Sequence, residues 1–301
     1  MPNLEQIQGR LDNIRTVEPI LGALRTISLG SWKASLNRQR ELRPYAEQLR
    51  GMLPLLVPRL EPGPITRLWR RVWVKGRRRR STTSPSRKVS VLIIGSERGL
   101  CSNFNERIFQ RVQLYLVEER DDGAEVDLMV LGSRLHRLFA RADLPLAWAE
   151  SLPVTTIPPF GLAFDLTRRW LLQYEAGEVD AVDLIYNAYR GLGRFEPTVE
   201  RLIPPEPPSA TTATLPPFTI IETDPLDLYT RVVEQWTAIH FYSLLLDSTA
   251  AEHSTRYQLM EGASENAERL IEELTDDLQS LRRQSITRQM QELAVGAGLL
   301  D

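Results

Sequence analysis

Apolar residues in the last quarter of the chain follow a helical spacing. The chain has 20 prolines, and none lies after Pro225, so residues 226–301 lack the strongest helix breaker. Within this stretch, apolar positions advance by threes and fours, as in the buried seam of a coiled coil. These positions are Met260, Ala263, Ala267, Ile271, Leu274, Leu278 and Leu281. The pattern predicts a helix of about 110 Å if continuous, which needs a neighbour to cover its apolar stripe.

The N-terminal segment shows the same spacing and could be that neighbour. Asn3 is a candidate cap for the helix start. The expected seam consists of Leu4, Ile7, Leu11, Ile14, Val17, Leu21, Leu24 and Ile27. Two such helices, from opposite ends of one chain, can bury their stripes on each other, and each buried Leu or Ile contributes about 1.5–3 kcal/mol. Pro19 interrupts the hydrogen bonding of this helix, so we expect a kink near residues 15–19.

The middle of the chain changes to a different period. Short apolar runs at 89–94, 126–131 and 181–189 predict buried strands, and the segments 105–120, 133–142 and 162–176 predict helices. Alternating strands and helices favour a small parallel sheet wrapped by helices. A further pair of strands is expected around residues 199–204 and 217–221.

Charge and cysteine content exclude several classes of protein. With 37 basic and 39 acidic side chains the net charge is −2, so no overall field attracts nucleic acid. Cys101 is the only cysteine, which excludes an internal disulfide and a zinc site made of several thiolates and favours a reducing compartment. Charges within the first 15 residues do not fit an export signal, and the apolar run 236–246 is too short to span a membrane.

One segment is strongly basic. Residues 67–88 contain ten Lys or Arg and no acidic residue, including the run Arg77, Arg78, Arg79 and Arg80. Such a linker could bind lipid headgroups, nucleic acid or an acidic protein partner. Of the single interpretations, a solvated loop is the one that the sequence favours most.

The turn after the first predicted strand, GSERGLCSN (95–103), is the best candidate for chemistry. A dinucleotide site needs G-x-G-x-x-G and a phosphate loop needs a Lys-Ser or Lys-Thr pair after its glycines, but here only Gly95 and Gly99 are present. A nucleophilic Cys101 needs a base, and no histidine carries a matching local signature. We therefore expect Cys101 to be a small buried side chain in a tight turn.

Two other segments have simple structural interpretations. The glycines in RGLGRF (190–195) favour a turn after a strand over a ligand loop. The acidic residues between 261 and 277 lie at helical spacing beside the apolar seam, which favours a solvated face over a metal site. The sequence predicts no catalytic residue, no cofactor and no metal site.

Several motifs, in order along the chain, resemble the γ subunit of F-type ATP synthases. The stretch 97–105 is similar to that family's aspartate-arginine-glycine-leucine-cysteine motif, and RPYAEQL (43–49) and IYNAY (185–189) match further segments. ENA (265–267), RRQSIT (282–287) and ELAVGAGLL (292–300) are similar to the family's C-terminal helix. Arg25 and Thr26 stand where the family has lysine and methionine, so the chain resembles a divergent member.

The resemblance implies an α+β fold, with a long antiparallel two-helix coiled coil beside a small Rossmann-like α/β domain. The expected parts are an N-terminal coiled-coil helix at 1–60, a basic linker at 61–88, the α/β domain at 89–222 and a C-terminal coiled-coil helix at 223–301. The implied function is that of a non-catalytic rotor shaft, which couples ion-driven rotation of a membrane c-ring to conformational change in a hexamer of α and β subunits.

The same resemblance assigns partners and contact residues. It implies one copy per complex, bound to the α/β hexamer, the ε subunit and the c-ring, on the cytoplasmic side of the membrane. The implied α/β contacts are Arg25, Arg283, Gln284 and Thr287, and the implied bearing tip is Ala294, Gly296, Ala297 and Gly298. Arg77 to Arg80 would lie near the c-ring or anionic lipid headgroups. Two alternatives remain open at this point, a nucleotide-binding Rossmann-like enzyme and a coiled-coil adaptor outside the synthase.

Overall fold

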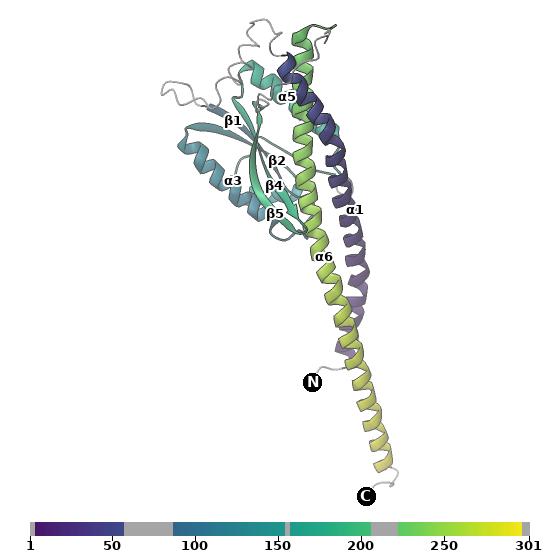
Figure 1. Cartoon of the computed structure of the whole chain (residues 1–301). Coiled ribbons are helices and arrows are strands. Elements are labelled where there is room, and N and C mark those ends of the chain that lie inside the picture. The colour runs from purple at the N-terminus through teal and green to yellow at the C-terminus, as the bar shows by residue number, and fades with distance from the viewer. Residues whose placement is uncertain (1–3, 57–86, 154–156, 206–221, 297–301) are drawn as a thin grey trace. The chain divides into compact units, whose positions relative to one another are not determined.

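A computed structural model of the chain describes residues 4–56, 87–153, 157–205 and 222–296. Two long helices, α1 (Leu4–Leu56) and α6 (Pro225–Gly296), come from the two ends of the chain (Figure 1). Helix α1 continues through three prolines, at 19, 44 and 54. The chain divides into a two-helix unit, residues 1–29 and 256–301, and a sheet unit, residues 30–255.

The sheet unit contains a five-stranded sheet in the order β3-β2-β1-β4-β5. Strand β1 pairs in parallel with β2 and β4, β2 pairs in parallel with β3, and β5 runs antiparallel to β4 at the edge. The strands are β1 (Arg87–Ile94), β2 (Ala124–Leu131), β3 (Trp148–Glu150), β4 (Ala181–Gly191) and β5 (Arg194–Ile203).

Most of the predicted strands are confirmed. The runs at 89–94, 126–131 and 181–189 lie in β1, β2 and β4, and most of 199–204 lies in β5. Strand β3 was not expected, and the segment 217–221 lies outside the described residues. The sheet is mixed rather than wholly parallel, because β4 returns directly into β5 through a short hairpin.

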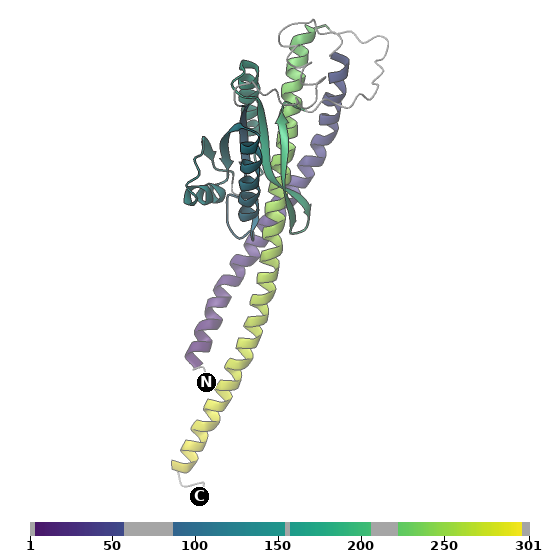
Figure 2. The same cartoon turned by 90° about the vertical axis from the view of Figure 1, so that its left-hand side faces the viewer.

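Helices cover both faces of this sheet, as Figures 1 and 2 show. The connecting helices are α3 (Phe104–Asp121), α4 (Ser133–Arg141) and α5 (Phe160–Ala176), close to the predicted ranges. Alternate residues of β1 enter two different cores, as the two-residue period of a strand requires. Val91 and Ile93 pack with α3 and α4, whereas Leu92 packs with α5 and with the parts of α1 and α6 in this unit.

In the two-helix unit, α1 and α6 run in opposite directions with apolar side chains between them. Ile7 and Leu11 are buried with Leu278, and Leu281 packs at the edge of the same cluster. Further along, Arg25 of α1 lies opposite Glu261 of α6, so residue numbers rise on one helix as they fall on the other. All of the apolar positions predicted for α6 are buried or half-buried.

The predicted seam of α1 is only partly correct. Val17 and Ile27 are exposed, at 49% and 42%. After Ile14, the inward positions pass instead through Glu18, Leu21, Arg25 and Ser28, which are half-buried or buried. In this series the spacing alternates between three and four residues, which keeps the buried positions facing the partner helix. A step from Ile14 to Val17 would instead place two spacings of three in succession. Polar residues therefore occupy inward positions that the hydrophobic pattern alone did not reveal.

Across the part of the chain that the structure describes, no helix combines the length and the apolar character needed to cross a bilayer.

Candidate functional site

The turn after β1 is built for close packing of backbone segments. The Gly95 N–H donates to the carbonyl of Leu131, at 2.8 Å, which joins the ends of β1 and β2. A Cβ on Gly95 would lie 2.3 Å from the Cβ of Leu135 in α4. Gly132 has φ +107°, and a Cβ there would lie 2.7 Å from the carbonyl oxygen of Gly95. These glycines allow two strand ends and a helix to approach one another, which explains their place without a bound ligand.

Glu97 lies at the start of α4, where its carboxylate is held by several hydrogen bonds. Its carboxylate accepts hydrogen bonds from the N–H of Ser133 at 3.0 Å, from the N–H of Leu152 at 2.9 Å and from the Ser133 hydroxyl. Ser133 begins α4, and the start of a helix attracts anions because its N–H groups and dipole point outward. The chain's own carboxylate therefore occupies the start of α4, at the carboxyl ends of β1 and β2.

The ionisation of Glu97 fits this role. Partial burial opposes its charge, but the hydrogen bonds from Ser133 and Leu152, with the positive charge of Arg137, outweigh burial and lower the pKa of the carboxyl group. Glu97 is therefore an internal anion that joins the β1 turn to α4 and to the segment after β3.

Cys101 is confirmed as a buried side chain in a tight turn. It is 2% exposed, and its Sγ lies 3.5 Å from the Ser96 hydroxyl. Asn105 completes the cluster, since its side-chain oxygen accepts from the Ser96 N–H at 2.9 Å and its amide donates to the Ser96 hydroxyl at 2.8 Å. Leu100 and Ser102, on either side of Cys101, have positive φ angles of 61° and 55°. The cluster fixes the conformation of the turn.

The other candidate segments also have structural roles. RGLGRF (190–195) forms the hairpin between β4 and β5, with positive φ at Gly191 and Gly193, so the predicted turn is confirmed. On α6, the acidic residues from 265 to 277 are exposed, as expected of a solvated face, whereas Glu261 is half-buried and pairs with Arg25. No cluster of His, Cys, Asp or Glu suited to a metal ion occurs within the described ranges.

The proposed contact residues lie in two separate places on the two-helix unit. Arg25 pairs with Glu261 through an N–O distance of 3.4 Å, and both side chains are partly exposed. Arg283, Gln284 and Thr287 are exposed together near the end of α6, where the Thr287 hydroxyl donates to the carbonyl of Arg283 at 2.9 Å. Twenty-two residues separate 261 from 283, which is about 33 Å along a helix. Arg25 therefore belongs to a different contact region from the other three.

The remaining proposed positions are only partly within the described residues. Ala294 is half-buried near the end of α6, and Gly296 is its last helical residue. Ala297 and Gly298 lie outside the described residues, as do Arg77 to Arg80.

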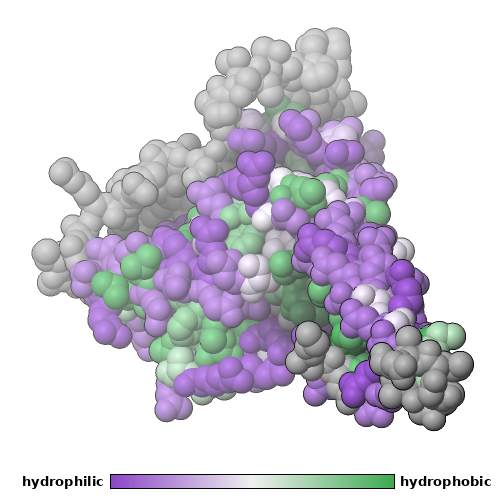
Figure 3. Space-filling model, turned by 90° about the horizontal axis from the view of Figure 1, so that it is seen from below, coloured by the Kyte–Doolittle hydropathy of each residue, from purple (hydrophilic) through white to green (hydrophobic). Residues whose placement is uncertain are grey.

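An exposed apolar stripe at the end of α6 was missed by the sequence interpretation. Ile286, Met290 and Leu293 are 56%, 67% and 73% exposed, and they follow Leu281, the last residue of α6 that packs with the start of α1. Their spacing of four and three places them on one side of the helix. That spacing was visible in the sequence and is the signal that could have identified them. Elsewhere, in the view from below, apolar groups are scattered among hydrophilic ones (Figure 3).

Comparisons with known proteins point to one family. The ATP synthase family is matched by residues 3–300. The chain is 26% identical to the ATP synthase gamma chain of Pelotomaculum thermopropionicum, covering 100% of both chains, and 28% identical to that of Gloeobacter violaceus, covering 99% of both. In the solved structures it is similar to a chain of the Tetrahymena thermophila mitochondrial ATP synthase central stalk and c-ring, with a TM-score of 0.55 and 22% identity, over 81% of this chain and 99% of that one.

A second structural neighbour supports the same fold. It is a chain of the Euglena gracilis mitochondrial ATP synthase, with a TM-score of 0.59 and 13% identity, covering 98% of this chain and 94% of that one. Terminal long helices joined to a five-stranded mixed sheet define a stalk-type fold. The chain belongs to the ATP synthase family. Within it, the chain is a gamma-type, non-catalytic subunit with the role of a rotor shaft.

Proposed function

We propose that the chain is the central shaft of an F-type ATP synthase, and that its two-helix unit turns inside a hexamer of α and β subunits. The observation that carries this proposal is the end of α6, whose apolar residues are exposed among the residues that the structure describes. There Ile286, Met290 and Leu293 expose apolar surface beyond the last contact with α1. Exposed apolar stripes mark surfaces that other proteins cover. A sleeve of surrounding subunits would cover this one.

The paired part of the unit works as an antiparallel coiled coil. The seam from Ile7 to Ser28 on α1, facing Met260 to Leu281 on α6, joins the helices so that a torque on one is carried by both. The outer face of α1 also leaves Val17, Ile20 and Ile27 exposed. An asymmetric rod with apolar and charged patches can contact one catalytic state of a neighbour better than another, and such differential contact is what coupling requires.

The contact residues have two roles, since some bind a β subunit and others permit rotation. Arg283, Gln284 and Thr287 catch a loop of a β subunit, because charge-assisted hydrogen bonds of about 1.5–3 kcal/mol can form and break in each step. Arg25 makes a second contact, nearer to the sheet unit along α1. The small residues Ala294, Gly296, Ala297 and Gly298 form the bearing tip, where short side chains permit rotation.

The sheet unit, with the linker at 61–88, forms the foot of the shaft. It contacts the ε subunit and the c-ring, one copy per complex, at the cytoplasmic side of the membrane. The four parts expected from the sequence, 1–60, 61–88, 89–222 and 223–301, correspond to the first shaft helix, the basic linker, the foot domain and the second shaft helix. Arg77 to Arg80 contact anionic headgroups or an acidic loop of the ring.

Reconstitution tests the proposal. The purified chain, mixed with its cognate α and β subunits, should form a complex with one copy per hexamer that hydrolyses ATP while the shaft rotates. The double variant Arg283→Ala plus Gln284→Ala should reduce rotation-coupled hydrolysis while its thermal midpoint stays within about 2 °C of the parent, because surface substitutions rarely cost more than about 0.5 kcal/mol.

A matched control is Arg269→Ala plus Gln279→Ala, at exposed positions on the same helix. This control should retain coupled hydrolysis. A stable homodimer that ignores α and β subunits would contradict the proposal and support a free coiled-coil adaptor. Equal loss of coupling in both double variants would contradict the assigned contact residues.

A further inference from the structure

A groove of about 210 Å³ lies between α5 and α6 in the sheet unit. Its floor is apolar, since Leu171, Tyr229 and Val233 line it and are 7%, 1% and 2% exposed. Leu172, on its rim, is 60% exposed. The groove therefore combines a well-packed floor with an apolar side chain that the described part of the chain leaves uncovered.

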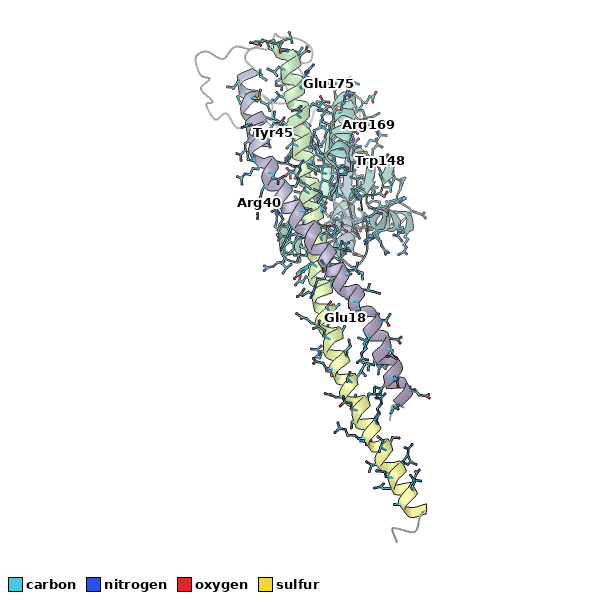
Figure 4. All side chains as sticks on the ribbon, turned by 90° about the vertical axis from the view of Figure 1, so that its right-hand side faces the viewer. Glu18, Arg40, Tyr45, Trp148, Arg169 and Glu175 are labelled. Carbon is cyan, nitrogen blue, oxygen red and sulfur yellow. The ribbon has the colours of Figure 1, made fainter. Side chains whose placement is uncertain are left out.

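Two carboxylates and one cation also line the groove. Glu234 of α6 lies 3.6 Å from the Arg168 guanidinium of α5, a weak contact because Arg168 is largely exposed. Glu175, on α5 (Figure 4), is the second carboxylate. Partial burial, followed by the negative charge of Glu234, raises its pKa. The groove thus holds one more negative than positive side chain, and its two carboxylates repel each other.

The size of the groove limits what it can hold. Sites for small molecules and cofactors have volumes of about 300–1,000 Å³, so this groove is below that range. A single long side chain fits it better. A side chain with an apolar stem and a cationic head matches both the floor and the charge, because such side chains lay their methylenes on apolar surface and keep the charge at the rim.

We propose that this groove is a docking site for a lysine or arginine side chain of a partner protein, with an apolar neighbour of that residue covering Leu172. The cationic head lies between the carboxylates of Glu175 and Glu234 and relieves their repulsion. The stem of the same side chain packs on Tyr229 and Val233. The partner is a subunit of the same assembly, so this inference rests on the proposed function only for the source of the partner.

Photo-crosslinking in the intact assembly tests this docking site. p-Benzoylphenylalanine replaces Thr230, which is exposed and lines the groove, in the full-length chain. The complex is purified through the α subunit and irradiated, and the crosslinked peptide is identified by mass spectrometry. We expect a peptide from another subunit with a lysine or arginine within about three residues of the crosslink. Residues at that separation lie about 10 Å apart in an extended strand, or one turn apart on a helix, so one can enter the groove while the other contacts Thr230.

Charge removal provides the second measurement. Glu175→Gln plus Glu234→Gln should reduce the crosslink yield about tenfold, because it removes the two charge-assisted hydrogen bonds of the cation. Asp165→Asn plus Glu178→Gln is the matched control, with the same charge change at exposed positions outside the groove lining. It should leave the yield unchanged, and both double variants should copurify with the α subunit.

Other outcomes overturn the inference. They are a crosslink to a peptide without a basic residue, a crosslink to this chain's own residues or to a second copy of it, no crosslink in the purified complex, or equal loss in both double variants. Failure to copurify with the α subunit would instead contradict the proposed function, so the two failures are distinguishable.

Discussion

At the scale of single residues, a few charged side chains connect parts of the sheet unit that are distant in sequence. Asp183 of β4 is 3% exposed, and the guanidinium of Arg201, its cross-strand partner in β5, donates to it at 2.6 and 2.7 Å. The Tyr115 hydroxyl of α3 donates to the same carboxylate at 2.6 Å. The bond to Asp183 raises the pKa of Arg201 despite its burial. A buried charge is tolerated in a protein when an opposite charge and hydrogen-bond donors surround it, as Arg201 and Tyr115 do here.

Glu97 has an equivalent role at the carboxyl ends of the strands, and Glu97→Gln tests it. Because the pKa of Glu97 is lowered in the folded protein, the ionised group stabilises the fold above the pKa of the unfolded chain, about 4.3. That contribution is lost as the pH falls through the folded value. We expect the variant to lose about 1 kcal/mol of unfolding free energy at pH 7 and to approach the parent below about pH 4.

Urea denaturation at a series of pH values measures this difference. Glu125→Gln, at an exposed position on β2, is the control and should follow the parent at every pH. A loss of the same size at pH 7 and pH 3 would show that the Glu97 charge is not what stabilises the turn.

The role of Glu97 could not be predicted from the sequence, because its partners Ser133 and Leu152 are 36 and 55 positions away. Only the fold brings α4 and the segment after β3 to the β1 turn. In contrast, the burial of Cys101 and the hairpin at 190–195 follow from local chemistry, since small residues and glycines in sequence specify tight turns directly. Local turn structure was predictable, and its long-range connections were not.

At the scale of elements, long periodic segments were predictable and short ones were not. The apolar runs at 89–94, 126–131 and 181–189 identified β1, β2 and β4, because buried parallel strands are apolar on both faces. Strand β3 has three residues, Trp148 to Glu150, which are too few to show a period. It is a strand because β2 offers it a free edge, with Met129 paired to Trp148.

The seam of α1 was half predictable for a related reason. A hydrophobicity pattern assigns apolar residues inward, but Glu18 and Arg25 hold inward positions there. Arg25 can do so because Glu261 lies opposite it, and long side chains can carry their charges out of a narrow two-helix interface. Val17 and Ile27, which the pattern placed inside, are then left on the outer face, where a partner can use them.

Alanine substitutions distinguish the two seams. Leu11 is 2% exposed in the two-helix unit, so Leu11→Ala should cost about 2–3 kcal/mol of local unfolding free energy, the lower part of the range for buried leucine. Val17 is 49% exposed, and Val17→Ala should cost less than about 0.5 kcal/mol in the isolated chain. Hydrogen exchange of the α1 amides measures both.

In the assembly, we expect Val17→Ala to affect binding more than Leu11→Ala does. Val17→Ala should weaken binding to the α/β hexamer measurably, because its exposed side chain is available to a partner. Similar destabilisation by both variants in the isolated chain would show that Val17 belongs to the seam after all.

At the scale of the whole molecule, the lengths of the two terminal helices differ in a way that separates folding from function. Helix α1 begins at Leu4, and the cluster that it forms with α6 ends at Leu281. Helix α6 continues to Gly296, and its exposed residues there contribute little to the stability of the isolated chain. A segment that is helical, apolar on one side and exposed among the described residues is best explained by a role outside the chain.

Truncation after Leu281 tests this separation. The shortened chain should keep its thermal midpoint within about 2 °C, since it loses no packed seam residue. In the reconstituted complex it should hydrolyse ATP more slowly than the parent, because the contacts of Arg283, Gln284 and Thr287 and the apolar stripe are removed together.

Truncation after Met260 is the contrasting variant, since it also removes Leu278 and exposes Ile7 and Leu11, and it should destabilise the two-helix unit outright. If truncation after Leu281 lowered the midpoint as much as that, the end of α6 would be a folding element and not a bearing. If it left both stability and hydrolysis unchanged, torque would have to be transmitted through the paired seam and the sheet unit alone.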